Sequence, residues 1–298
     1  MSFVPVEPGY EFVTILPPRR SAPPPPEDGV WGTLQLTLHA DTHLHLGSGV
    51  PVPVSVDAVP VPVDTLAAGT ASVPRRFGTH FEAVIPGSGW KGAVRAITEA
   101  LTPSCDPFDQ GCGADGTGLC PACTLFGIGG QRGRIGFTDA SAAETEPRVL
   151  RVRQRYSHPS APASGRRVYR TTAEQSAAAA EEYLQTIPPG TALRGELTLH
   201  GVPSWGLGLL TIVLGLGPRG LPFLRVGGGK NRGLGIVTVD RIGGAVADGL
   251  AAWMHNRRVR LDDEGVRRER LVAWQDDAVG TFPVLEERIA RIREIMES

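Results

Sequence analysis

The order of strand-like and helix-like segments restricts the fold of this chain more than any other feature. Apolar periodicities of two and of 3.6 residues mark the expected strands and helices. The expected strands lie at 31–40, just before Gly87, at 133–140, at 190–201 and in the second half of 224–242, and the expected helices lie at 88–102 and 204–217. These elements alternate too loosely for a doubly wound parallel sheet. Their order favours an α+β, ferredoxin-like core with large insertions.

The segments outside this core have weaker patterns. Residues 1–30 are rich in proline and predict an extended or disordered arm. Residues 50–76 alternate valine with proline and predict a long loop or an excursion from a sheet edge. Residues 141–182 predict an irregular excursion with a hairpin or a short helix. From residue 245 onward the pattern is helical and charged, as in a solvated cap or a partner-docking element.

Composition narrows the class of protein. Hydrophobic residues make up 41% of the chain, which is ordinary for a globular domain. No apolar run approaches the roughly 18 residues of a membrane helix, and no signal-peptide pattern opens the chain. We therefore expect a cytoplasmic protein with no membrane partner. The net charge of −1 means that any nucleic-acid site must come from a local cluster of cations.

The four cysteines of the chain lie close together, in the spacing Cys105-x6-Cys112-x7-Cys120-x2-Cys123. A C-x-x-C pair supplies two thiolates to a tetrahedral zinc site, and two more ligands close it. In a cytoplasmic protein this pattern favours structural zinc over disulfides. A nearby histidine in place of Cys105 or Cys112 is one alternative, and free thiols in a loop are another. Four thiolates leave no open position, so such a zinc would hold a loop and not catalyse.

The stretch IPGSGWKGAVR, residues 85–95, is a glycine-rich turn that runs into a helix. Its glycines spell G-x-G-x-x-G, but no strand ending in an acidic residue follows, so no dinucleotide site is expected. Ser88 is the expected N-cap of the helix. Lys91 and Arg95 share one helix face near the unpaired N–H groups, a combination that favours phosphate. The alternative is a tight turn with a solvated basic face.

The stretch VGGGKNRGLG, residues 226–235, repeats this chemistry with Lys230 and Arg232. Lys91 and Lys230 are the two lysines of the chain, and each lies in a glycine-rich segment. A compact ammonium beside exposed backbone N–H groups is a suitable phosphate ligand. Two such loops on one core suggest a groove that follows a nucleic-acid backbone. The alternative is a glycine-rich hairpin.

Two further groups of residues are candidates for chemistry. Asp57 and Asp64 lie on a proline-bounded segment, where a carboxylate can bind a metal or transfer a proton, although a lone Asp there is more often a turn residue. Arginines interleaved with tyrosines follow between 148 and 170, a pattern that suits phosphate contact plus base stacking, or else an exposed loop. These residues are Arg148, Arg151, Arg153, Arg155, Tyr156, Arg166, Arg167, Tyr169 and Arg170.

An ordered set of short motifs resembles the RAMP superfamily, and within it the Cas7-type backbone subunits of type III CRISPR effectors. The motifs are GSG at 47–49, IPGSGWKGAVR at 85–95, CPACTLFG at 120–127, GRIGFTDA at 133–140, EYLQTIPPGT at 182–191 and GGGKNRGLGIV at 227–237. The resemblance spans about residues 31–243. It leaves the arm at 1–30 and a helical extension at 244–298 outside the domain.

The resemblance implies an RRM-like core that binds a guide crRNA and stacks with copies of itself and with other effector subunits. It implies a zinc insertion at about 103–130, held by the four cysteines, and a thumb-like insertion at about 141–182 that interrupts the guide–target duplex. It also implies that the glycine-rich turns contact the guide backbone. The residues expected there are Gly47, Ser48, Gly49, Ser88, Lys91, Arg95, Gly228, Lys230 and Arg232.

The resemblance also implies a candidate for catalysis. Catalytic relatives carry an Asp in a local pattern like V-D-x-P-[IV], and this chain reads VDAVPV, with one extra residue before the proline. Asp57 is therefore the expected residue for cleavage of the target RNA, with a divalent metal such as Mg²⁺. A non-catalytic RNA-binding scaffold of the same kind is the first alternative. An enzyme that binds a small nucleotide in the glycine loops is the second.

Overall fold

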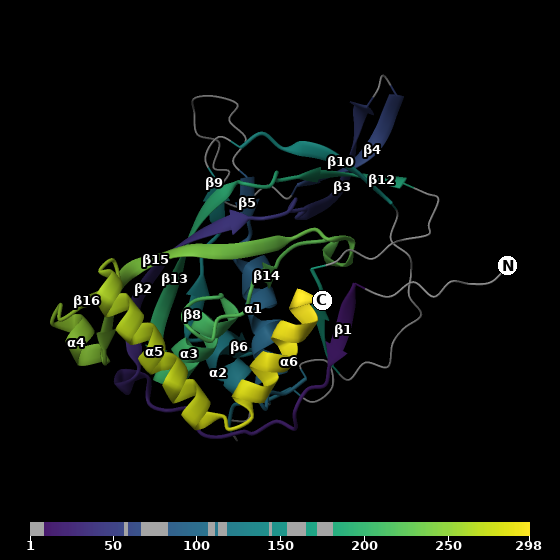
Figure 1. Cartoon of the computed structure of the whole chain (residues 1–298). Coiled ribbons are helices and arrows are strands. Elements are labelled where there is room, and N and C mark those ends of the chain that lie inside the picture. Colours follow the sequence, from purple (N-terminus) through teal and green to yellow (C-terminus); the bar gives the residue numbers. More distant parts are fainter. Residues whose placement is uncertain are drawn as a thin grey trace.

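A curled antiparallel sheet forms the centre of the protein (Figure 1). The computed structural model describes residues 9–56, 59–66, 83–106, 111–112, 118–142, 145–153, 165–171 and 181–298. The sheet order is β14–β15–β2–β13–β9–β5, with β16 beside β15 and β8 beside β13. The strands are β2 (Val30–Ala40), β5 (Ala83–Ile85), β8 (Ile135–Phe137), β9 (Ala140–Ala142), β13 (Ala192–Val202), β14 (Leu224–Arg225), β15 (Ile236–Asp248) and β16 (Val259–Arg260).

The connectivity of the core confirms the ferredoxin-like prediction. In chain order the core elements are β2, α1, β8, β13, α3 and β15, which is the β-α-β-β-α-β sequence. In the sheet, β15 lies beside β2, β2 beside β13 and β13 beside β8. Each of these neighbouring pairs is antiparallel. The expected strands at 133–140, 190–201 and 236–242 lie in this sheet. The fold class is therefore α+β.

Helices cover one face of the sheet and leave the other open (Figure 1). The helices are α1 (Gly87–Leu101), α2 (Pro121–Phe126), α3 (Ser204–Val213), α4 (Leu250–Met254), α5 (Glu264–Thr281) and α6 (Leu285–Glu297), with 3-10 turns η1 (Pro26–Asp28) and η2 (Lys230–Arg232). Strand β2 explains the two faces, because Leu34, Leu36 and Leu38 are buried while their neighbours are partly or fully exposed. Within the helical layer Gly208 of α3 lies against Trp274 of α5, where a Cβ would come within 2.1 Å of the Trp274 carbonyl oxygen.

A second, four-stranded sheet contains residues 50–56 and 59–66, where the sequence predicted a long loop or an excursion from a sheet edge, so these residues are not a loop. Its order is β10–β12–β4–β3, and the strands are β3 (Gly47–Val56), β4 (Val59–Leu66), β10 (Arg148–Arg153) and β12 (Glu181–Thr186). The prolines are tolerated because Pro53 faces Pro62 across the β3–β4 pair. Two residues without N–H can face each other only at a position that needs no ladder hydrogen bond. The valine pairs on either side of these prolines, Val52 with Val63 and Val54 with Val61, therefore take the hydrogen-bonded positions.

The described part of the N-terminal arm is extended and lies against the core, so of the two alternatives predicted for residues 1–30, extended or disordered, the structure shows the extended one from residue 9 onward. Strand β1 (Tyr10–Val13) pairs antiparallel with β11 (Arg166–Tyr169). Further along, Ser21 forms a bridge with Leu119. Arg134 donates a hydrogen bond to the carbonyl of Pro24. An extended, proline-rich segment can satisfy its carbonyls only through donors from elsewhere, and the core supplies them.

Three element boundaries differ from expectation. Strand β15 continues to Asp248, beyond the expected start of the helical region at 245. Residues 141–182 include β10 and β11, and β12 begins within them. In the cysteine region the short strands β6 (Gly127–Ile128) and β7 (Gln131–Arg132) pair with each other.

Among the described residues, no helix is long and apolar enough to cross a membrane.

Candidate metal centre and nucleic-acid interface

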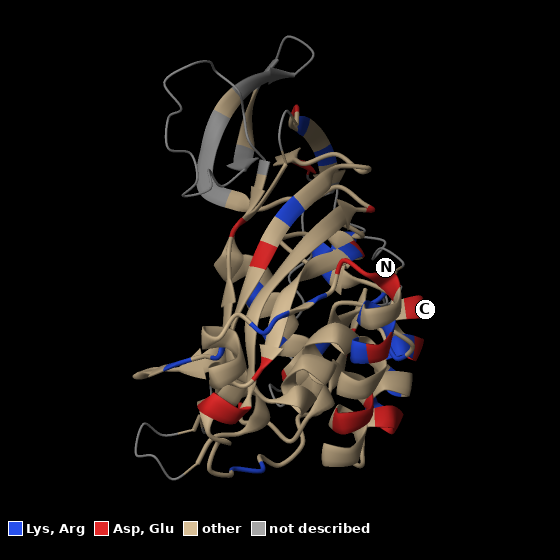
Figure 2. Cartoon of the chain, turned by 90° about the vertical axis from the view of Figure 1, so that its left-hand side faces the viewer, with Lys and Arg blue, Asp and Glu red and all other residues tan. Residues whose placement is uncertain are grey.

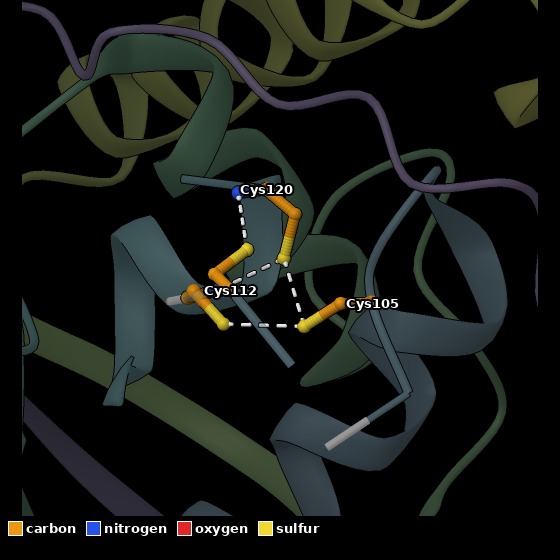
Figure 3. Close-up of side chains that lie close together, drawn as sticks. Cys105, Cys112 and Cys120 are labelled. Carbon is orange, nitrogen blue, oxygen red and sulfur yellow. Dashed lines mark hydrogen bonds between the residues drawn. The ribbon is translucent and has the colours of Figure 1, made fainter. Parts of the chain in front are cut away.

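The four cysteines converge on one point inside the protein. Their sulfur atoms all lie within 4.8 Å of one another, and all four side chains are buried. Figure 3 shows Cys105, Cys112 and Cys120 pointing toward each other. The Sγ of Cys105 lies 3.5 Å from that of Cys123 and 3.6 Å from that of Cys120. Cys120 and Cys123 meet because helix α2 begins between them, with Cys120 as its N-cap.

These distances suit a tetrahedral zinc site. A Zn–S bond of about 2.3 Å in a tetrahedron separates two sulfurs by about 3.8 Å. The two sulfur pairs of Cys105, at 3.5 and 3.6 Å, are close to this value and far from a disulfide bond of about 2 Å. The cluster that the structure brings together consists of cysteines alone, so no histidine is needed as a ligand. The donors therefore fit a structural zinc held by four thiolates, with no open position for catalysis.

Without an ion, the pKa values of Cys105, Cys120 and Cys123 move apart, and only that of Cys120 falls. The hydrogen bond from Cys123 lowers the pKa of Cys120 to about 4. Burial, followed by repulsion from Cys120, raises the pKa of Cys105 to about 11. Adjacent buried thiols cannot all ionise, because each new charge repels the last in a poorly solvated site. A zinc ion would supply the positive charge that allows all four to bind as thiolates.

The side chain of Arg95, which the sequence predicted at the guide backbone, lies against the cysteine cluster. Its guanidinium donates to Glu99 at 2.8 Å, to the carbonyl of Gly127 at 2.8 Å and to the Sγ of Cys123 at 3.6 Å. Glu99 is 2% exposed and also accepts from Arg166 at 2.6 Å. A chain of contacts thus runs from the cysteines through Arg95 and Glu99 to Arg166 on β11. The only sequence signal for it is the four-residue spacing of Arg95 and Glu99.

The first turn of α1 differs from expectation in its cap. Helix α1 begins at Gly87, and its N-cap is Pro86, so Ser88 is not the N-cap. The carboxylate of Asp139 accepts the Gly87 N–H at 2.7 Å and takes the place that an anionic ligand was expected to hold. Ser88 is exposed and Lys91 is half-buried. Burial, then repulsion from Arg95 and Arg132, lowers the pKa of Lys91.

The second glycine loop is more closed than the sequence suggested. The Gly228 N–H donates to the carbonyl of His45 at 2.7 Å and is already satisfied. Arg232 pairs with Glu182 of β12. Gly229 and Gly233 flank η2 in the left-handed region, at φ of 67° and 80°, which explains why glycines stand there. Lys230 points into the protein, with its Nζ 5.5 Å from the ring centre of Tyr169.

The remaining predicted residues divide between the second sheet and the undescribed part of the chain. Gly47, Ser48 and Gly49 lie in β3 and not in a turn. Asp64 lies in β4, opposite Pro51. Asp57 lies outside the described residues.

Charge on the open side of the molecule is mixed. Figure 2 shows basic and acidic residues interspersed on the sheet and the helices, with no continuous basic face in that view. The open face of the sheet also has a broad hollow of about 560 Å³, whose charged lining residues are Arg194, Glu196, Arg241 and Asp262. A strand of nucleic acid would therefore depend on local cations and not on a uniform field.

The chain is compared with protein-family models, with curated protein sequences and with solved structures. The family model described as the RAMP superfamily matches residues 37–238, more than half of the chain. No curated protein sequence matches. Among solved structures, a chain of the complex titled "Cryo-EM structure of the Type III-B Cmr-beta bound to cognate target RNA" is similar, with 17% identity and a TM-score of 0.36. The match covers 72% of this chain and 61% of that one, so the chain spans less than two thirds of its relative.

Proposed function

The chain belongs to the RAMP superfamily, and from this premise we propose that it is a Cas7-like subunit that binds guide crRNA in a type III CRISPR ribonucleoprotein. The match of the family model over residues 37–238 carries the proposal. The ferredoxin-like topology and the ordered motifs support it. Its partners would be crRNA, target RNA, other effector subunits and copies of itself.

The two lysines of the chain, one in each glycine-rich segment, are the candidate contacts for RNA phosphates. Lys91 lies in the first turns of α1, and Ala93 and Ala96 of the same helix line a cavity together with Lys230. Lys91 lies roughly 160° around the helix from Ala93 and does not face this cavity, and 139 positions separate the two lysines in the sequence. Phosphate contacts by lysine fix the position of a strand without reading its sequence.

The test of RNA binding is to purify the full chain with its neighbouring gene products and to sequence the nucleic acid that accompanies it. We expect RNAs with a common repeat-derived end and variable interiors. Protein free of RNA would contradict the proposal. Saturable binding of a mononucleotide by that RNA-free protein would then favour the small-nucleotide enzyme.

We further propose that Asp57 cleaves the paired target RNA with a divalent metal such as Mg²⁺. The local pattern VDAVPV supports this role. A carboxylate can hold the metal that activates a nucleophile or stabilises the leaving oxygen. The alternative is a scaffold that binds RNA without cutting it.

Substitution Asp57→Asn should abolish Mg²⁺-dependent cleavage by the assembled complex, by at least 100-fold, and leave RNA affinity unchanged. The matched control is Asp277→Asn, which removes an exposed carboxylate from α5. Cleavage rates on labelled target RNA and RNA affinities are measured for both variants. Cleavage by Asp57→Asn at the control rate would remove this residue from the mechanism, and no cleavage by any form would favour the scaffold.

A further inference from the structure

A small cavity of about 160 Å³ lies between α1, β11, β14 and η2. Three cations line it, Arg167, Arg225 and Lys230, together with Tyr169 and apolar side chains that come mainly from α1. All of its lining residues belong to the described part of the chain, and none of them is acidic. The cavity therefore gathers positive charge from three elements that are distant in the sequence.

Arg225 is the deepest of these cations. It is 5% exposed, and its guanidinium donates to the carbonyl of Leu234 at 2.9 Å and to the carbonyls of Arg170 and Thr171. Its Nε is buried and has no hydrogen-bond partner among the described residues. Each known partner is a neutral carbonyl, so the charge of Arg225 is not balanced by a carboxylate there. A buried donor without a partner is destabilising, and a bound acceptor would remove that penalty.

Lys230 adds a second cation without a balancing carboxylate among the described residues. The ring of Tyr169 is its recorded contact, at 5.5 Å from Nζ to the ring centre. Burial, followed by repulsion from Arg225, lowers the pKa of Lys230. Burial also lowers the pKa of Arg225 to about 10. Both shifts have the direction expected when cations are gathered away from water without a counter-ion.

Arg167 connects the cavity with an aromatic rim. Its guanidinium carbon lies 5.0 Å from the ring centre of Tyr10 and 5.5 Å from that of Phe12, both on β1. Phe12 is 38% exposed, so part of this side chain is open to solvent. Tyr10 also lies 5.8 Å from Tyr169, so the rings of β1 and β11 form one cluster beside the cations. Phosphate contact beside exposed rings is typical of sites that bind single strands.

We propose that this cavity binds one phosphate group, with Lys230, Arg167 and the Nε of Arg225 as its ligands. The small volume and the three converging cations fit a single phosphate better than a whole nucleotide. An RNA strand and a free phosphate compound are two sources of the same chemistry. This inference deepens the proposed function. Phosphate binding by the cavity does not depend on that function, but the identification of RNA as the source of the phosphate rests on it.

The first measurement titrates inorganic phosphate into the full chain at constant ionic strength, followed by ³¹P line broadening and by the melting temperature. We expect saturable binding that is weakened at least tenfold in Lys230→Met and in Arg167→Met. The second variant changes an exposed side chain, so it keeps the test valid if Lys230→Met fails to fold. Arg258→Met removes an exposed cation that follows α4, outside the cavity, and should bind phosphate like the natural chain.

The second measurement adds a short single-stranded RNA to the phosphate complex. Displacement of phosphate by RNA, from the natural chain and equally from Arg258→Met, would identify an RNA phosphate as the ligand. Phosphate binding that RNA does not displace would support the cavity and point to a free phosphate compound, while leaving the guide-binding proposal to its own test. Phosphate binding that is absent, or equal in all the variants, would overturn the inference even if the protein carries RNA.

Discussion

At the scale of single residues, Lys91 and Arg95 show how tertiary contacts separate two cations that share one helix face. The sequence places them four positions apart on α1 and gives both the same expected partner. In the structure Arg95 is bound on three sides, by Glu99, Gly127 and Cys123. Lys91 has no ion pair among the described residues and stays half-exposed. The two side chains should therefore have different roles.

Substitution Arg95→Met should destabilise the protein by about 3 kcal/mol, because it removes one of the two arginines that hold the buried carboxylate of Glu99. It should also weaken zinc retention, because Cys123 loses an N–H donor. Urea unfolding measures the first effect, and competition with a chelator measures the second.

Lys91→Met is the matched variant, since it removes one cation from the same helix. We expect it to leave unfolding and zinc retention unchanged and to weaken RNA binding severalfold, with a smaller salt dependence. If Arg95→Met instead weakened RNA binding alone and kept zinc and stability, the inward role of Arg95 would be wrong.

At the scale of elements, the cysteine region consists of a short helix and short strands that need a further link to hold their arrangement. Helix α2 has six residues, and β6 and β7 have two residues each. Elements this short are marginal without external support. A zinc ion held by the four sulfurs would supply it by fixing Cys105, after α1, to the start of α2. The same centre reaches β11 through Arg95, Glu99 and Arg166.

Removal of the metal should therefore loosen this region first. We expect one zinc per chain by elemental analysis and, after chelation, a loss of stability of several kcal/mol. Hydrogen exchange should become faster in α2 and β6 before it changes in β2 and β13. A chain that binds no zinc, or one whose exchange is unaffected by chelation, would show that the cysteines are structural thiols only.

At the scale of the whole molecule, segments from both ends of the chain close over the core beside the cavity. Glu11 of β1 pairs with Arg170 and with Arg291 of α6. Arg288 of α6 donates to the carbonyl of Ala100 at the end of α1, at 2.9 Å. Figure 1 shows α6 next to α1 and β14. Both segments lie outside the expected domain at 31–243, yet they help to build its surface.

The sequence by itself determined the parts of this protein that depend on local pattern. Alternating leucines placed β2, the order of the elements indicated the ferredoxin-like core, and the C-x-x-C spacing indicated the metal centre. Each is a property of neighbours along the chain, namely side-chain period or cysteine spacing, and the structure shows the cysteine cluster that the spacing indicated. The Val/Pro alternation of β3 and β4 misled the same reasoning, because the pairing of Pro53 with Pro62 depends on a partner strand.

The tertiary structure alone decided which cations face inward and which carboxylates meet them. Asp139 caps α1 from 52 positions away, and Glu99 joins Arg95 to Arg166 across 67 positions. Arg225 and Lys230 meet Arg167 only because β14, η2 and β11 pack together. No local pattern encodes such contacts, since their strength comes from burial and from the distance between charges that folding sets. For this reason the sequence could point to the basic segments but could not say which of their residues are available to a ligand.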